Sequence, residues 1–170
     1  MKNFILTGLL LISTFPLYSQ DFDFELEPNF ETTADVTAAT ENYLTAAKWL
    51  ISSPHDPDNS DWKKVGAYTL AWISATDSFG VTLSQEMLSF SEDNSSLLLI
   101  FTAAWGIHAL ENPEDLDDPA ACCFAAITVV LDYAESNESS LENSRSLRKL
   151  QRLQRKGELE EWAVDVIPKR

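Results

Sequence analysis

The sequence predicts an all-α protein with one domain, a bundle of five or six helices around a central apolar helix. Apolar residues recur at helical spacing in the long segments of the chain. The stretch from Leu97 to Leu110 is apolar on all sides, so it must be enclosed by protein or lipid. Its 14 residues fall short of the roughly 20 that cross a bilayer, which favours a core helix. A chain of 170 residues, 45% of them hydrophobic, has the size and composition of one domain.

The N-terminus has the pattern of a secretory signal peptide. Lys2 precedes an apolar run from Phe4 to Ile12, and small or polar residues near Ser19 suit cleavage ahead of Gln20. An uncleaved membrane anchor is the alternative, but the run is too short to span. We therefore expect a signal peptide over residues 1–19, export to the periplasm or the extracellular space, an extended arm over 20–32 that docks or frays, and a helical domain over 33–168.

The first half of the domain predicts two helices and an ambiguous segment. We expect a helix from about Thr33 to Ile51, followed by a proline-rich loop. Ser60 is a good N-cap for a second helix that ends near Thr76. The segment from Val81 to Phe90 alternates at first like a strand and then suits a short helix or loop.

After the central helix, Asp118 and Pro119 have the pattern of an N-cap and a first helical residue. The helix that follows, Ala120 to Glu135, is apolar over most of its circumference. Cys122 and Cys123 lie on that apolar arc. A disulfide between adjacent cysteines is incompatible with a regular helix, so we expect two buried free thiols.

The last long helix, from about Ser140 to Lys156, has two distinct faces. Leucines at 147, 150 and 153 form the packing face, and Gly157 suits the C′ position, before a short amphipathic stretch. The opposite side carries four arginines, namely Arg145, Arg148, Arg152 and Arg155. They form either a solvated face, ion pairs to the acidic body of the same molecule, or a docking strip for an acidic partner or anionic envelope material.

Candidate catalytic or metal-binding groups are few, and the sequence predicts no cofactor and no metal site. His55 lies in the proline-rich loop and His108 in the central helix. His108 and Glu111 lack the second such unit that a di-iron bundle needs, which favours a hydrogen-bonded core histidine. The segment 114–118 has four acids that would suit calcium, but it lacks the glycine-centred EF-hand loop, so we expect a helix-capping loop. The sequence has no GxSxG, HExxH, CxxC or phosphate-binding glycine loop.

The net charge of −15 disfavours nucleic acid and anionic membranes as partners of the whole surface. The blocks AAKWL, GAYTLAWISATD, LLIFTAAWGIHALEN and LQRKGELEEWA follow a leader ending in SQ. In that order they resemble small exported helical proteins of uncharacterised function from Bacteroidota-type bacteria, over about residues 33–167. The resemblance implies no catalytic residues.

Two function classes are left. The first is a non-catalytic exported protein that binds another envelope protein or a small apolar ligand. This class fits the aromatic-rich helices and the missing catalytic motifs. The alternative is a hydrolase-like enzyme that uses dispersed carboxylates in a helical cleft, which would require two carboxyl groups of raised pKa in one cavity.

Overall fold

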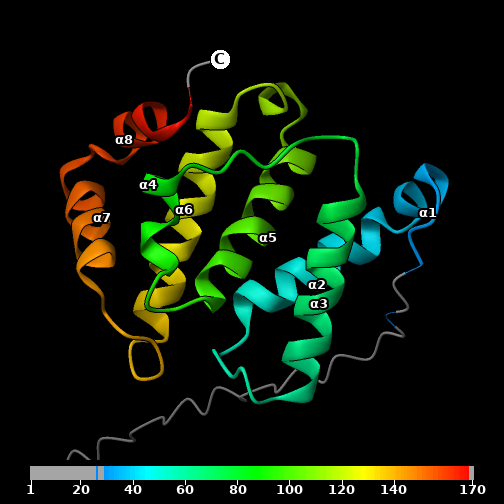
Figure 1. The fold of residues 1–170 in the computed structure, drawn as a ribbon, viewed down its shortest axis with the longest axis horizontal. Coiled ribbons are helices and arrows are strands. Elements are labelled where there is room, and N and C mark those ends of the chain that lie inside the picture. Colours follow the sequence, from blue (N-terminus) through cyan, green and yellow to red (C-terminus); the bar gives the residue numbers. More distant parts are fainter. Residues whose placement is uncertain (1–25, 27–28, 169–170) are drawn as a thin grey trace, which may run out of the picture.

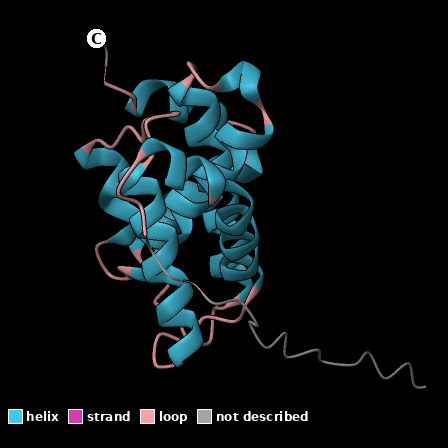
Figure 2. Cartoon of the chain, turned by 90° about the vertical axis from the view of Figure 1, so that its right-hand side faces the viewer, coloured by secondary structure: helices cyan, strands magenta, loops and turns pink. Residues whose placement is uncertain are grey.

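The computed structural model describes Leu26 and residues 29–168, and in this part of the chain the regular structure is entirely helical (Figures 1 and 2). This confirms the predicted all-α class. The predicted signal peptide, residues 1–19, lies outside the described residues. The helices are α1 (Thr33–Ala38), α2 (Thr40–Ser52), α3 (Ser60–Ala75), α4 (Gln85–Leu88), α5 (Ser96–Glu111), α6 (Pro119–Ser136), α7 (Arg145–Lys156) and α8 (Leu159–Val166), with 3-10 helices η1 (Ser89–Ser91) and η2 (Pro113–Asp115).

The described residues form eight α-helices, which is more than the predicted five or six. The predicted first helix divides at Ala39, where the backbone turns to φ −88° and ψ 0°. A capping box between Thr32 and Asp35 starts the short α1. The ambiguous segment supplies the other helix: Ser84 accepts a hydrogen bond from the Met87 N–H and begins α4, and Met87 and Phe90 are fully buried.

Two predicted helix starts were wrong by one and by five residues. Asn59, rather than Ser60, caps α3, since its side-chain oxygen accepts from the Asp61 and Trp62 N–H groups at 2.8 and 3.1 Å. The last long helix begins at Arg145 instead of Ser140, because Ser144 adopts extended backbone and its hydroxyl accepts from the Leu147 N–H. Residues 137–144 are therefore a connection between α6 and α7.

Helix α5 lies at the centre of the bundle, with α6 on one side and α2 and α3 on the other (Figure 1). Complete enclosure is not confirmed, because several of its side chains, including Leu98, Leu99 and Ile107, are half-buried. Its buried residues are Leu97, Ile100, Phe101, Thr102, Ala103, Ala104, Trp105, Gly106 and Ala109. Because α5 is this apolar, it contributes to the hydrophobic core on both of its sides.

Close contact between α2 and α5 depends on Gly106. The Tyr43 side chain of α2 is fully buried, and its hydroxyl donates to the Ala103 carbonyl at 3.2 Å. A Cβ on Gly106 would overlap that hydroxyl and lie 2.9 Å from the Tyr43 Cζ atom. The Tyr43 ring stacks on Trp72 of α3, with centroids 4.1 Å apart, so one contact joins three helices.

Helix α6 packs against α5 and α8, and its start follows the sequence prediction. Asp118 accepts from the Ala120 and Ala121 N–H groups, with Pro119 at the first helical position. By length and composition α6 is also the one described helix that is apolar enough to cross a membrane. Because eight of its residues are buried in the protein, we interpret it as a core helix.

The described end of the predicted arm docks on the domain. Leu26 and Phe30 are half-buried against the core. The Phe30 ring lies 5.5 Å from that of Tyr68 in α3, centroid to centroid. Thr32, the last residue of the predicted arm, already serves as the cap of α1.

Candidate docking surface on α7

Helix α7 forms because it is capped at both ends and has one apolar face. Leu147 and Leu150 are buried and Leu153 is half-buried, so this face packs on the bundle. At the C-terminal end Gly157 adopts φ 72° and ψ 24°, a left-handed conformation that glycine takes without strain. The Glu158 N–H then donates to the Leu153 carbonyl at 2.9 Å, as in a Schellman motif, which confirms the predicted C′ glycine.

The face opposite the leucines is entirely basic. At about 100° per residue, the six cationic residues of α7 fall within an arc of about 120°. The four predicted arginines are all exposed on this arc. We call Arg145, Arg148, Arg152 and Arg155 the arginine strip. The two lysines, Lys149 and Lys156, lie along its edge.

Within the described residues, the lysines of α7 have carboxylate partners and the arginines do not. Lys149 Nζ lies 3.5 Å from Glu86 of α4, and Lys156 Nζ lies 3.5 Å from Glu158. Arg148 donates to the backbone carbonyl of Asn143, which leaves its charge without a counterion. In the part of the chain that the structure describes, no arginine of the strip forms an ion pair, so the alternative of intramolecular pairing finds no support there.

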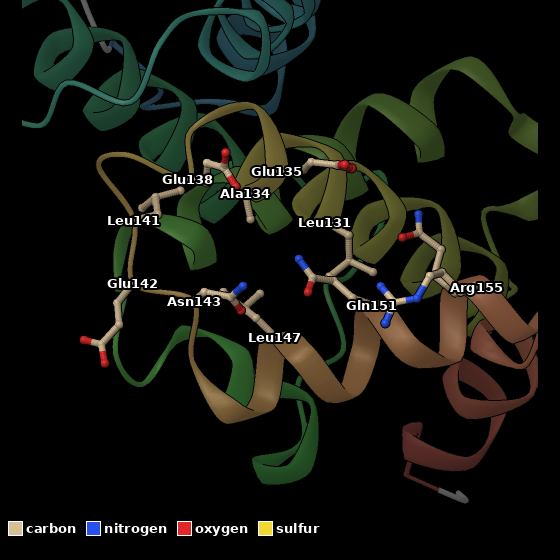
Figure 3. A pocket seen from close by; sticks show the side chains of 11 residues that line it. Leu131, Ala134, Glu135, Glu138, Leu141, Glu142, Asn143, Leu147, Gln151 and Arg155 are labelled. Carbon is tan, nitrogen blue, oxygen red and sulfur yellow. The ribbon is translucent and has the colours of Figure 1, made fainter.

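A groove of about 330 Å³ runs beside the strip, between α6, the connection 137–144 and α7 (Figure 3). Its apolar lining comes from Leu131, Ala134, Leu141 and Leu147, and its polar lining from Asn143, Gln151, Gln154, Glu135, Glu138, Glu142 and Arg155. Glu138 and Glu142 lie at one end and Arg155 at the other (Figure 3). Arg155 thus belongs to both the strip and the groove.

The connection that closes one end of the groove is fixed by a reciprocal pair of hydrogen bonds. The Asn94 side chain donates to the Glu142 carbonyl at 2.7 Å and accepts from the Glu142 N–H at 2.9 Å. Both bonds use the backbone of Glu142, so its carboxylate is left for other contacts. This groove was not predicted from the sequence. One signal was available in Gln151 of α7, which at about 100° per residue lies between the leucine and arginine faces.

His108 is hydrogen-bonded, as expected, but it is only partly buried. Its Nε2 lies 2.9 Å from Asp115 Oδ2 and its Nδ1 lies 3.2 Å from the Asn112 amide. The acidic segment 114–118 is therefore a helix-capping loop, as expected. Asp115 forms the contact with His108, and Asp118 is the N-cap of α6. Among the described residues no group of three histidine, cysteine or carboxylate side chains is placed to hold a metal ion.

Cys122 and Cys123 are buried free thiols, as predicted. Burial raises the pKa of Cys122 to about 11, and the nearby Asp115 and Asp118 carboxylates add to the rise. Burial likewise raises the pKa of Cys123 to about 12. Thiols with such pKa values carry little thiolate near neutral pH, so they are poor nucleophiles.

His55 ties the proline-rich loop to the end of α6. The backbone N–H of His55 donates to Asn137 Oδ1 at 2.7 Å, and the ring Nδ1 lies 3.3 Å from the Ser140 hydroxyl. Its ring lies edge-on to Trp62 and Tyr133. Desolvation lowers the pKa of His55, against the opposing effects of Ser140 and Asp56. A second hollow of about 370 Å³, lined by Pro54, Tyr133 and Asn137 among others, lies beside this contact.

No protein-family model, curated protein or solved structure matches this chain. The resemblance to exported helical proteins of Bacteroidota-type bacteria therefore stays a prediction.

Proposed function

We propose that this protein is a non-catalytic, exported binding protein whose arginine strip docks an acidic envelope protein. The supporting observation is that four exposed arginines lie on one arc without a carboxylate partner among the described residues, in a chain of net charge −15. Such a chain has many acidic side chains for its own cations, so an unpaired basic strip is a local exception. Complementary charge across an interface steers association and selects partners.

The proposal includes the place of action. The pattern of residues 1–19 supports export, which would expose the mature chain to periplasmic or extracellular partners. The strip is small next to the acidic surface as a whole, so a broad anionic surface such as a membrane would be repelled by the rest of the molecule. A protein with a local acidic patch fits better than an extended anionic layer.

A second candidate is the hydrolase-like enzyme, and the groove gives it a specific location. Glu135, Glu138 and Glu142 line one concave site, as carboxylate chemistry would require. His108 does not line this groove. If this candidate holds, replacing Glu135 and Glu138 by glutamine would abolish a hydrolytic activity while leaving partner capture unchanged.

The test is charge reversal in the strip. Arg148→Glu with Arg152→Glu changes two residues that do not line the groove. Lys63→Glu with Lys64→Glu reverses two exposed cations on α3 and is a matched control for net charge. We expect the strip variant to lose capture of envelope proteins, and the control to keep it. Equal capture by both variants would contradict the proposal.

A further inference from the structure

The groove beside α7 is lined by both apolar side chains and side-chain amides. Its floor is apolar, because Leu131, Ala134 and Leu147 are buried residues that line it. Three side-chain amides, those of Asn143, Gln151 and Gln154, also line it. A primary amide carries both a donor and an acceptor, so it can pair with either the N–H or the C=O of a peptide backbone.

Three carboxylates and one cation line the groove, and one of the carboxylates, Glu135, lies between its two ends (Figure 3). Glu138 and Glu142 lie at the end formed by the connection, and Arg155 lies at the far end (Figure 3). From Leu147 to Arg155 the axis of α7 advances about 12 Å, at 1.5 Å per residue. An extended chain covers that length in about four residues, at about 3.3 Å each.

We propose that the groove binds an extended peptide segment of about four residues, with a cationic side chain at the Glu138 and Glu142 end and a carboxylate at Arg155. The inference builds on the proposed function, since the segment would belong to the partner that the strip docks. An apolar side chain in the middle of the segment would contact the leucine floor. The volume of about 330 Å³ suits a few side chains.

The groove and the strip can be tested separately. Arg148 and Arg152 belong to the strip and do not line the groove, whereas Gln151 and Glu138 line the groove and are no part of the strip. Glu138 and Glu142 are exposed, and the hydrogen bonds from Asn94 go to the backbone of Glu142. Their side chains can therefore be replaced without disturbing the connection.

The experiment titrates the full chain with peptides blocked at both ends, by calorimetry. One peptide has lysine, alanine, leucine and glutamate in this order, a second has the reverse order, and a third has glutamine in place of both charged residues. Each exposed ion pair changes affinity by at most about fivefold. We therefore expect one charged order to bind roughly 3- to 20-fold more tightly than the neutral peptide.

Two variants test which end of the groove binds each charged side chain of the peptide. Arg155→Gln should remove the preference for glutamate over glutamine, while Glu138→Gln with Glu142→Gln should remove the preference for lysine. Absence of saturable binding, or equal binding of all three peptides, would overturn the inference. If the strip variant loses partner capture and the peptides do not bind, the groove proposal alone fails. If the peptides bind and the strip variant keeps capture, the strip proposal alone fails.

Discussion

Replacing Gly106 by alanine tests the packing that joins α2, α3 and α5. The new Cβ would overlap the Tyr43 hydroxyl and lie 2.9 Å from its Cζ and 3.2 Å from Phe79 Cζ. Tyr43 is fully buried and stacked on Trp72, so its ring has little room to move. Overpacking of this kind costs about 1–3 kcal/mol.

Two further effects of the substitution change the free energy of unfolding in opposite directions. Displacing the Tyr43 ring would weaken its 3.2 Å hydrogen bond to Ala103, which costs about 1 kcal/mol. Alanine is the better helix former, which returns about 1 kcal/mol. The expected net loss in the free energy of unfolding is about 1–3 kcal/mol. For a chain of this size that lowers Tm by roughly 3–9 °C.

Urea unfolding followed by tryptophan fluorescence measures this loss. Gly80→Ala is the matched control, since nothing lies within 4 Å of a Cβ at Gly80 and its φ is not positive. In a Tyr43→Phe background the hydroxyl is gone, so Gly106→Ala should cost less there than in the wild-type protein. A Gly106→Ala variant as stable as Gly80→Ala would refute this account of the core.

Three more predictions follow from other parts of the molecule. Because the pKa values of Cys122 and Cys123 are raised to about 11 and 12, the folded protein should resist alkylation by iodoacetamide at pH 8. The denatured, unreduced protein should take up two alkyl groups, as measured by mass spectrometry. Fewer than two would indicate a disulfide. The lowered pKa of His55 means that the unfolded chain binds this proton at higher pH than the folded one. The stability due to neutral His55 should thus be complete above the ordinary pKa of about 6.5 and should decline as the pH falls from there through the pKa of the folded state. His55→Gln should flatten that part of a plot of unfolding free energy against pH. An unchanged plot would contradict this role of His55. If the predicted signal peptide is cleaved, N-terminal sequencing of the protein purified from cells that make it should start at Gln20, whereas an intact Met1 would contradict export with cleavage.

Much of the fold followed from local sequence signals, because those signals act through local geometry. Asp118 with Pro119 and Gly157 marked helix ends correctly, since caps and left-handed glycines depend on a few neighbouring residues. Ser60 was wrong as an N-cap and Ser140 as a helix start for the same reason: Asn59 and Ser144 lie close by and hold the caps instead. The division at Ala39 has no glycine or proline to signal it.

The surface was predictable in part. The arginine strip follows from helical periodicity, so its exposure on one arc of α7 could be expected. The groove lies between α6, α7 and the connection 137–144. That connection is held by the contact of Asn94 with Glu142, 48 residues apart. Likewise the need for glycine at 106 comes from Tyr43 on another helix. No local pattern encodes such long-range contacts.

The most direct measurement of the central claim is site-specific photocrosslinking in cells that make the protein. A photoreactive amino acid would replace Arg152 on the strip or, as a control, Lys64 on α3, both of which are exposed. The docking account predicts a discrete crosslinked protein from position 152 that is absent at position 64 and weakens when Arg148→Glu is added. Equal crosslinking from both positions, or none at position 152, would contradict the account and leave the strip as a solvated face.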